Sequence, residues 1–160
     1  MRYVLLALFL SAANIFAGTE ATPALSSVIP KEIEAIYPRD GKNTVIVRVE
    51  QDSDIYVLLQ NSDGEVGAWL LYRFTARTQK AELLKASEVL FPFDAGDVRT
   101  PPKQVQAALA TAVAQHMVAT YPGGVSKMSD YWQQNADGWR NLPHELQDAF
   151  KAAGITVPAS

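Results

Sequence analysis

Few residues of this 160-residue chain could carry out catalysis. It contains no cysteine and only two histidines, His116 and His144. We find no serine nucleophile elbow, no zinc-protease motif and no phosphate-binding loop. His116 borders the apolar stripe of an uncharged segment, a position typical of a histidine that satisfies a hydrogen bond in the core. We therefore identify no catalytic residue, and a non-enzymatic role is favoured.

The same residue types give no metal site. His144 and Asp148 are four residues apart and would face the same way on a helix, but two ligands do not make a site. Three acidic turns begin at Asp52, Asp63 and Asp94, and none has the regular ligand spacing of a calcium loop. We expect neither a metal nor a cofactor.

The most distinctive stretch of the sequence, residues 131–140, places two tryptophans among amides and an acid. Trp132 and Trp139, with Asp130 and Asp137 nearby, have the composition of a sugar-binding platform or a glycan hydrolase. The two tryptophans also fall on one helical face with Met128, the pattern of an aromatic stripe that packs into a core. The core interpretation is favoured, and the glycan site is kept as the alternative.

The strands give a second candidate site, because both of their faces are apolar. A sheet with one face in water should alternate apolar and polar residues. We expect one face to be covered by the uncharged helix, and the other by later helices, by the N-terminal arm or by another protein. The last option predicts an exposed partner-binding patch formed by Tyr56, Leu58, Trp69 and Leu71.

The elements that must position these residues follow from hydrophobic periodicity. Four strands are predicted, the last of which would also suit a helix face: 44–50, 55–60, 66–75 and 80–85. Helices are predicted at 30–37, with Ile33, Ile36 and Tyr37 inward, and from Thr100 to Tyr121, the last member of the apolar stripe of that helix. Further helices are predicted at 127–136 and from Pro143 onward, where Gly154 would form a left-handed C-cap and Ile155 would fold back on Phe150. The fold class is α+β, an antiparallel three- or four-stranded β-meander followed by two to three packed helices.

The N-terminus has the three parts of a secretory signal peptide. Arg2 precedes a short apolar run that ends in small residues, with Ala17 as the expected cleavage point and Ala21 as the second choice. We expect a cleaved signal peptide at 1–17, a flexible arm at 18–29 and one globular domain at 30–160. The absence of cysteine favours a bacterial periplasm over a eukaryotic secretory route.

The charge of the chain narrows the possible partners. Its net charge of −3 and its lack of a basic cluster exclude nucleic acid as an expected partner. No membrane anchor is expected in the mature chain. The favoured function is an exported, periplasmic, non-enzymatic protein-binding module, either an inhibitor or immunity-type protein or an accessory subunit. Its partner would be another periplasmic protein or a second copy of the chain. The alternative is a cell-envelope glycan binder or hydrolase acting on peptidoglycan.

Overall fold

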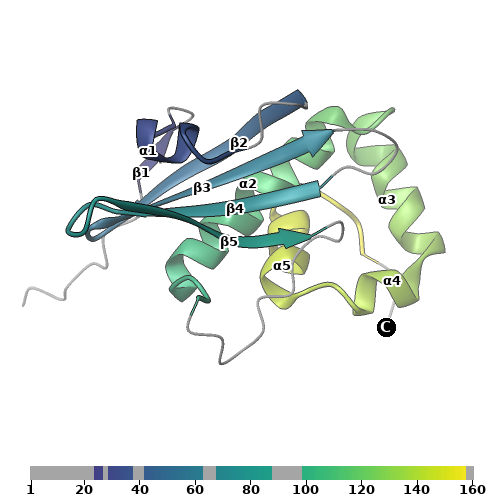
Figure 1. The fold of residues 1–160 in the computed structure, drawn as a ribbon. Coiled ribbons are helices and arrows are strands. Elements are labelled where there is room, and N and C mark those ends of the chain that lie inside the picture. The colour runs from purple at the N-terminus through teal and green to yellow at the C-terminus, as the bar shows by residue number, and fades with distance from the viewer. Residues whose placement is uncertain (1–23, 27–28, 38–41, 63–67, 88–98, 158–160) are drawn as a thin grey trace, which may run out of the picture.

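An antiparallel sheet whose strands lie in sequence order forms the centre of the fold (Figure 1). The structure is a computed structural model that describes residues 24–26, 29–37, 42–62, 68–87 and 99–157. The five strands are β1 (Ala24–Ser26), β2 (Lys42–Gln51), β3 (Asp54–Ser62), β4 (Ala68–Thr75) and β5 (Lys80–Ser87). The four predicted strands correspond to β2 to β5, so the predicted meander is confirmed.

Local turn chemistry sets the register of the meander. The β2–β3 hairpin closes through Asp52, whose φ of 55° lies in the left-handed region that aspartate tolerates better than most residues. The β4–β5 turn closes through Gln79 at φ 53°. With these turns in place Val49 pairs with Tyr56 and Phe74 pairs with Ala81, and the apolar residues of neighbouring strands lie side by side on each face.

The first strand was not predicted. Residues 24–26 fall inside the segment expected to be a flexible arm, and they pair instead with residues 48–50 of β2. Short strands of three residues carry too little periodicity to be recognised in a sequence. The predicted signal peptide, residues 1–17, lies outside the described residues.

Helices follow the sheet, as predicted. They are α2 (Lys103–Thr120), α3 (Gly124–Gln134), α4 (Ala136–Arg140) and α5 (His144–Ala152), and a short helix α1 (Lys31–Glu34) precedes β2. The sequence did not predict α4. This helix begins because Asn135 Oδ1 accepts a hydrogen bond from the Gly138 N–H at 3.2 Å, the N-cap interaction of a new helix.

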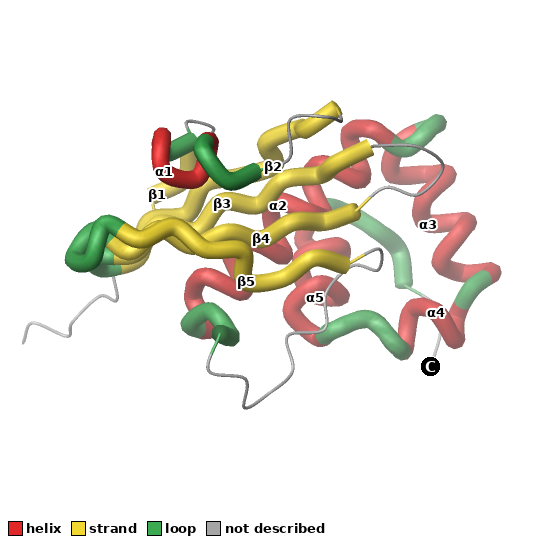
Figure 2. The backbone as a smooth tube through the Cα atoms, in the orientation of Figure 1, coloured by secondary structure: helices red, strands yellow, loops and turns green. Residues whose placement is uncertain are grey.

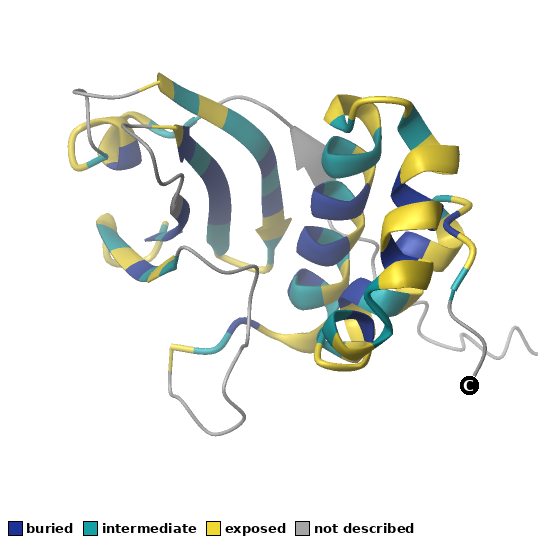
Figure 3. Cartoon of the chain, turned by 90° about the vertical axis from the view of Figure 1, so that its right-hand side faces the viewer, coloured by how far each residue is buried: buried dark blue, intermediate teal, exposed yellow. Residues whose placement is uncertain are grey.

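Two helices cover one face of the sheet, which we call the inner face. In Figure 1, α2 and α5 lie behind the sheet and α1 lies in front of it. Helix α2 packs against β2 and α5, and Figure 2 shows α3 beyond them at one end of the strands. Figure 3 shows the exposed positions of these helices mostly on the side away from the sheet. The absence of charged residues from Val105 to the end of α2 is explained by this burial between sheet and helix.

The opposite face of the sheet, the outer face, is covered by the N-terminal segment 29–37. Ile33 of α1 is fully buried against this face, while Ile36, predicted to face inward, is 47% exposed. The correction follows from the helix length, because α1 ends at Glu34 and Ile36 lies in the turn beyond it. The outer-face cluster consists of Ile33, Val57, Leu59, Leu70, Tyr72 and Phe74. The main described cover of this face is therefore the predicted helix at 30–37 and not the arm expected at 18–29, of which Ile29 packs against the cluster.

The C-terminal helix ends as the sequence predicts. Gly154 has a φ of 90°, its N–H donates to Lys151 O at 3.0 Å, and the Ile155 N–H donates to Phe150 O at 3.0 Å. This is the hydrogen-bond pattern of a Schellman motif, and Ile155 is buried in the inner-face core as the motif requires.

Candidate functional site

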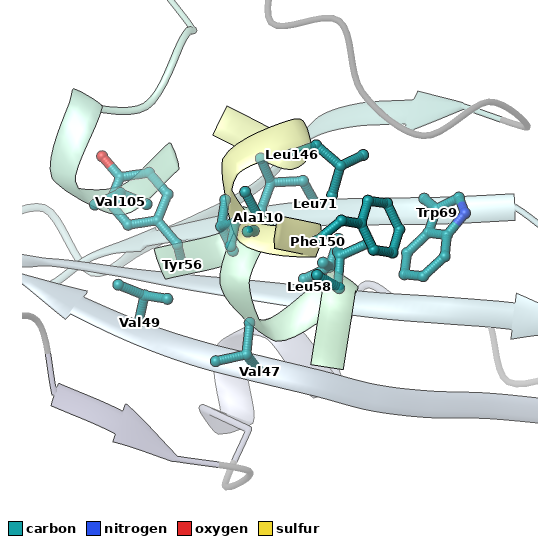
Figure 4. Packing of buried hydrophobic residues seen from close by; sticks show 14 of the residues in the cluster. Val47, Val49, Tyr56, Leu58, Trp69, Leu71, Val105, Ala110, Leu146 and Phe150 are labelled. Atoms are coloured by element: carbon teal, nitrogen blue, oxygen red, sulfur yellow. The ribbon is translucent and has the colours of Figure 1, made fainter. Parts of the chain in front are cut away.

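The predicted partner-binding patch lies in the core. Tyr56, Leu58, Trp69 and Leu71 are 3%, 0%, 7% and 1% exposed. Figure 4 shows these side chains among residues of α2 and α5, including Val105, Ala110 and Phe150. The prediction of an exposed patch is therefore wrong. Because α2 and α5 both cover the inner face, no partner protein is needed to bury it.

The end of this core farthest from α3 is closed by polar groups. Tyr56 Oη lies 3.5 Å from Asp54 Oδ2, and Arg73 Nε donates to Glu82 Oε1 at 3.1 Å. Burial, and after it the nearby Asp54 carboxylate, raises the pKa of Tyr56. The hydrogen bond from Arg73 lowers the pKa of Glu82. These groups satisfy one another across neighbouring strands, a structural role at the rim of the inner face.

The two tryptophans of the predicted glycan platform are also core residues. Trp132 and Trp139 are buried with ring centroids 5.5 Å apart, and both pack on Phe150. Asp137 pairs with Arg140 on the surface, and Asp130 lies 3.4 Å from Lys127 Nζ. The four predicted residues therefore do not converge on one site: Trp132 borders one surface hollow and Asp130 borders a neighbouring one.

A candidate site among the described residues is an open groove between the ends of β3 and β4, the C-terminal end of α2, and α3. We call it the aromatic groove, and its volume is about 670 Å³, within the usual range of ligand sites. It is lined by Gln60, Trp69, His116, Met117, Thr120, Tyr121, Pro122, Tyr131, Trp132 and Leu142. Most of these side chains are apolar or aromatic, so the groove offers mainly an apolar surface.

A glycine turn brings the two helices of the groove together. Gly123 and Gly124, between α2 and α3, have φ values of 87° and 61°, a conformation that other residues adopt only with strain. A Cβ at Gly123 would also lie 2.4 Å from Lys127 Cγ. This turn folds α3 back beside α2, so that Tyr121 and Tyr131 meet with ring centroids 6.3 Å apart.

Three polar side chains of the aromatic groove, those of Gln60, His116 and Thr120, already have intramolecular partners. His116 Nε2 and Gln60 Oε1 are 3.0 Å apart, and Thr120 Oγ1 donates to the backbone O of His116 at 2.8 Å. Trp132 Nε1 is buried and has no acceptor in the part of the chain that the structure describes. Because this nitrogen is shielded, the Trp132 indole meets the groove through carbon atoms.

Tyr131 is an exposed ring held in one position. It is 45% exposed, yet it packs edge-on against Trp132 with centroids 5.0 Å apart and planes at 71°. Its hydroxyl accepts a hydrogen bond from Asn135 Nδ2 at 3.2 Å. An exposed aromatic ring fixed by several contacts presents a large surface with little remaining conformational freedom to lose on binding.

A second, polar hollow adjoins the aromatic groove. It has a volume of about 520 Å³ and is lined by Tyr121, Pro122, Lys127, Asp130, Tyr131 and Gln134. Tyr121, Pro122 and Tyr131 belong to both, so these three residues form the rim between an apolar and a polar compartment.

Sequence reasoning missed the residues that make this groove. Tyr121 was identified only as a member of a helical stripe and Tyr131 only as part of an aromatic stretch. The usable signal was the Pro122-Gly123-Gly124 turn, which predicts two helices folded back on each other. His116, interpreted as a structural residue, bonds with Gln60 and lies in the wall of the groove.

Among the described residues, no three His, Asp or Glu side chains gather where they could hold a metal ion. None of the helices described is both long enough and apolar enough to cross a bilayer.

Comparison with known proteins gives no relative. No family model, no curated protein and no solved structure matches the chain.

Proposed function

We propose that this protein is an exported, non-enzymatic module of the bacterial periplasm that binds another protein. The partner would place an apolar or aromatic side chain in the aromatic groove. An inhibitor, an immunity-type protein or an accessory subunit would act in this way. The predicted signal peptide supports the location.

The observation that carries the proposal is the exposed and fixed ring of Tyr131 beside an apolar groove. Tyrosine and tryptophan are enriched among the residues that dominate protein–protein binding energy. Because the side chains of Gln60, His116 and Thr120 are already hydrogen-bonded within the chain, an apolar ligand group loses little on entering. The many hydroxyl groups of a sugar would find fewer partners there.

The test compares captures from a periplasmic extract by two tagged variants. Tyr131→Ala removes the exposed ring of the groove. Leu83→Ala removes a side chain of nearly equal exposure, 44%, from β5 on the outer face. We expect the wild type and Leu83→Ala to retain one stoichiometric protein, identified by mass spectrometry, and Tyr131→Ala to lose it. A partner retained by Tyr131→Ala would contradict the proposed site.

A glycan is the second candidate, favoured by the polar hollow beside Tyr131, where Asp130 and Gln134 could bind sugar hydroxyls. Cosedimentation with purified peptidoglycan tests it. Binding that is lost in both Tyr131→Ala and Asp130→Asn would establish the glycan function, whereas a supernatant that keeps all the protein would exclude it. A second copy of the chain is the remaining partner, and light scattering of the purified protein would detect the dimer.

A further inference from the structure

We infer that Asn135 is a positioning residue of the aromatic groove, holding the Tyr131 ring in its binding orientation through the same side chain that begins α4. The inference rests on the proposed function, in which Tyr131 is the main binding ring.

Both the oxygen and the nitrogen of the Asn135 side-chain amide form hydrogen bonds. Its Oδ1 accepts from the Gly138 N–H at 3.2 Å, and its Nδ2 donates to the Tyr131 hydroxyl at 3.2 Å. The backbone N–H can only donate, so the oxygen must face Gly138 and the nitrogen must face Tyr131. One side chain therefore joins the start of α4 to the exposed ring of α3.

Gly138 provides the space that this arrangement needs. A Cβ at position 138 would lie 2.5 Å from Asn135 Nδ2 and 2.8 Å from Asn135 Oδ1. Real Cβ atoms do not approach other atoms so closely, so any larger residue would displace the amide from both partners. The absence of a side chain at Gly138 therefore allows the Asn135 amide to reach Tyr131.

Three contacts restrain Tyr131, and Asn135 makes the one at the tip of the side chain. Tyr121 and Trp132 pack against the ring, but aromatic contacts at 6.3 and 5.0 Å still permit it to tilt. The hydrogen bond to the hydroxyl fixes the far end. Without it the exposed ring gains rotational freedom, which must be lost again when a ligand binds.

Substitutions at position 135 separate the two roles. Asn135→Ser keeps a good N-cap oxygen for α4, but its side chain is too short to reach Tyr131. Asn135→Asp also keeps the cap, and its second carboxylate oxygen can accept from the Tyr131 O–H, which restores the link with the opposite polarity. Asn135→Ala removes both interactions.

The first measurement is the NMR spectrum of protein with isotope-labelled tyrosine rings. We expect Asn135→Ser to weaken the cross-relaxation between the rings of Tyr131 and Trp132, and Asn135→Asp to preserve it. Thermal denaturation should show Asn135→Ser and Asn135→Asp to be close to the wild type, with Asn135→Ala less stable. Unchanged Tyr131 signals in Asn135→Ser would overturn the inference.

The second measurement is the affinity for N-acetyl-tryptophan amide, a minimal peptide probe, followed by chemical shifts. We expect Asn135→Ser and Tyr131→Phe each to weaken binding about threefold to tenfold, and Asn135→Asp to bind as the wild type does. In the Tyr131→Phe background, Asn135→Ser should have no further effect. A further loss there would contradict a role through the Tyr131 hydroxyl.

The two measurements distinguish the two proposals. If the wild type does not shift with the probe but the ring signals respond to Asn135→Ser as expected, the positioning role stands and peptide binding in the groove fails. If the probe binds equally to all variants, the groove is a binding site and the positioning role fails.

Discussion

The two faces of the sheet are equally apolar in sequence but are covered in different ways. The inner face packs against α2, an 18-residue helix, and against α5. The outer face packs against the short segment 29–37, in which Ile33 is the fully buried residue of a four-residue helix. A long helix spreads its contribution over many side chains, whereas a short segment depends on a few. The comparison shows that an apolar face can be closed by an element too short to be recognised as a cover.

The largest effect is expected on the inner face. Leu58 is fully buried between the sheet and the helices, so Leu58→Ala should lower the free energy of unfolding by about 3 kcal/mol through lost burial and a cavity. Urea denaturation measures the change. Leu83→Ala, on the exposed part of β5, is the matched control and should stay within about 0.5 kcal/mol of the wild type. Equal losses in the two variants would be incompatible with the burial of the inner face.

A core substitution on the outer face should lower the free energy of unfolding somewhat less than one on the inner face. We expect Ile33→Ala to cost about 2 kcal/mol because it empties a fully enclosed site on α1. Ile36→Ala is a close control, since the same residue type three positions later is exposed, and it should change stability by less than about 0.5 kcal/mol. If Ile33→Ala were as mild as Ile36→Ala, the N-terminal segment would contribute little to the cover of this face.

The next prediction concerns the C-terminal end of α5, one of the two helices that cover the inner face. Gly154 has a φ of 90°, and a Cβ there would meet only Val125 Cγ1, at the ordinary distance of 3.8 Å. The cost of Gly154→Ala is therefore conformational, and we expect about 1 to 2 kcal/mol by thermal denaturation. Gly124→Ala, at φ 61° with no atom close to its Cβ, should cost a similar or smaller amount. A neutral Gly154→Ala would contradict the Schellman geometry.

The smallest effect concerns the ion pair at the rim of the inner face. Arg73 holds the pKa of Glu82 below its usual value, so the folded-state pKa lies below the unfolded one. The stabilisation is therefore present above the unfolded pKa of about 4.3 and is lost as the pH falls through the folded pKa. We expect Glu82→Gln to lower stability by about 0.5 kcal/mol at neutral pH.

A series of urea titrations at decreasing pH measures the contribution of the Arg73–Glu82 ion pair to the free energy of unfolding. The difference between the wild type and Glu82→Gln should shrink as the pH is lowered from neutral through the unfolded pKa of Glu82 and then through its lower folded-state pKa. A difference that stays constant over this interval would mean that the Glu82 charge does not contribute through its partner.

Much of the fold could be predicted from local pattern. Alternation in β2, the turn at Asp52 and the uncharged stretch of α2 each determine their element through interactions between near neighbours. The C-cap at Gly154 is local in the same sense. By contrast, β1 and α4 were missed because three strand residues and a five-residue helix have too few positions to show a period.

The candidate site was less predictable, because it depends on which residues of distant elements meet. In the sequence, a tryptophan can be either an exposed binding residue or a member of the core. The packing of α2, α3 and α5 buries both Trp69 and Trp132. Tyr131, next to Trp132 in the chain, is left exposed because successive helical residues point in different directions.

The amino-acid sequence alone predicted strands β2 to β5, the long helices, the turn between β2 and β3 and the need to cover both faces of the sheet. It did so because periodicity and turn preference act over a few residues. The folded structure was needed to show that residues 29–37 close the outer face, that the predicted patch is core, and that Tyr121 and Tyr131 share the rim of a groove. These outcomes depend on contacts between segments far apart in the chain, which no local pattern contains.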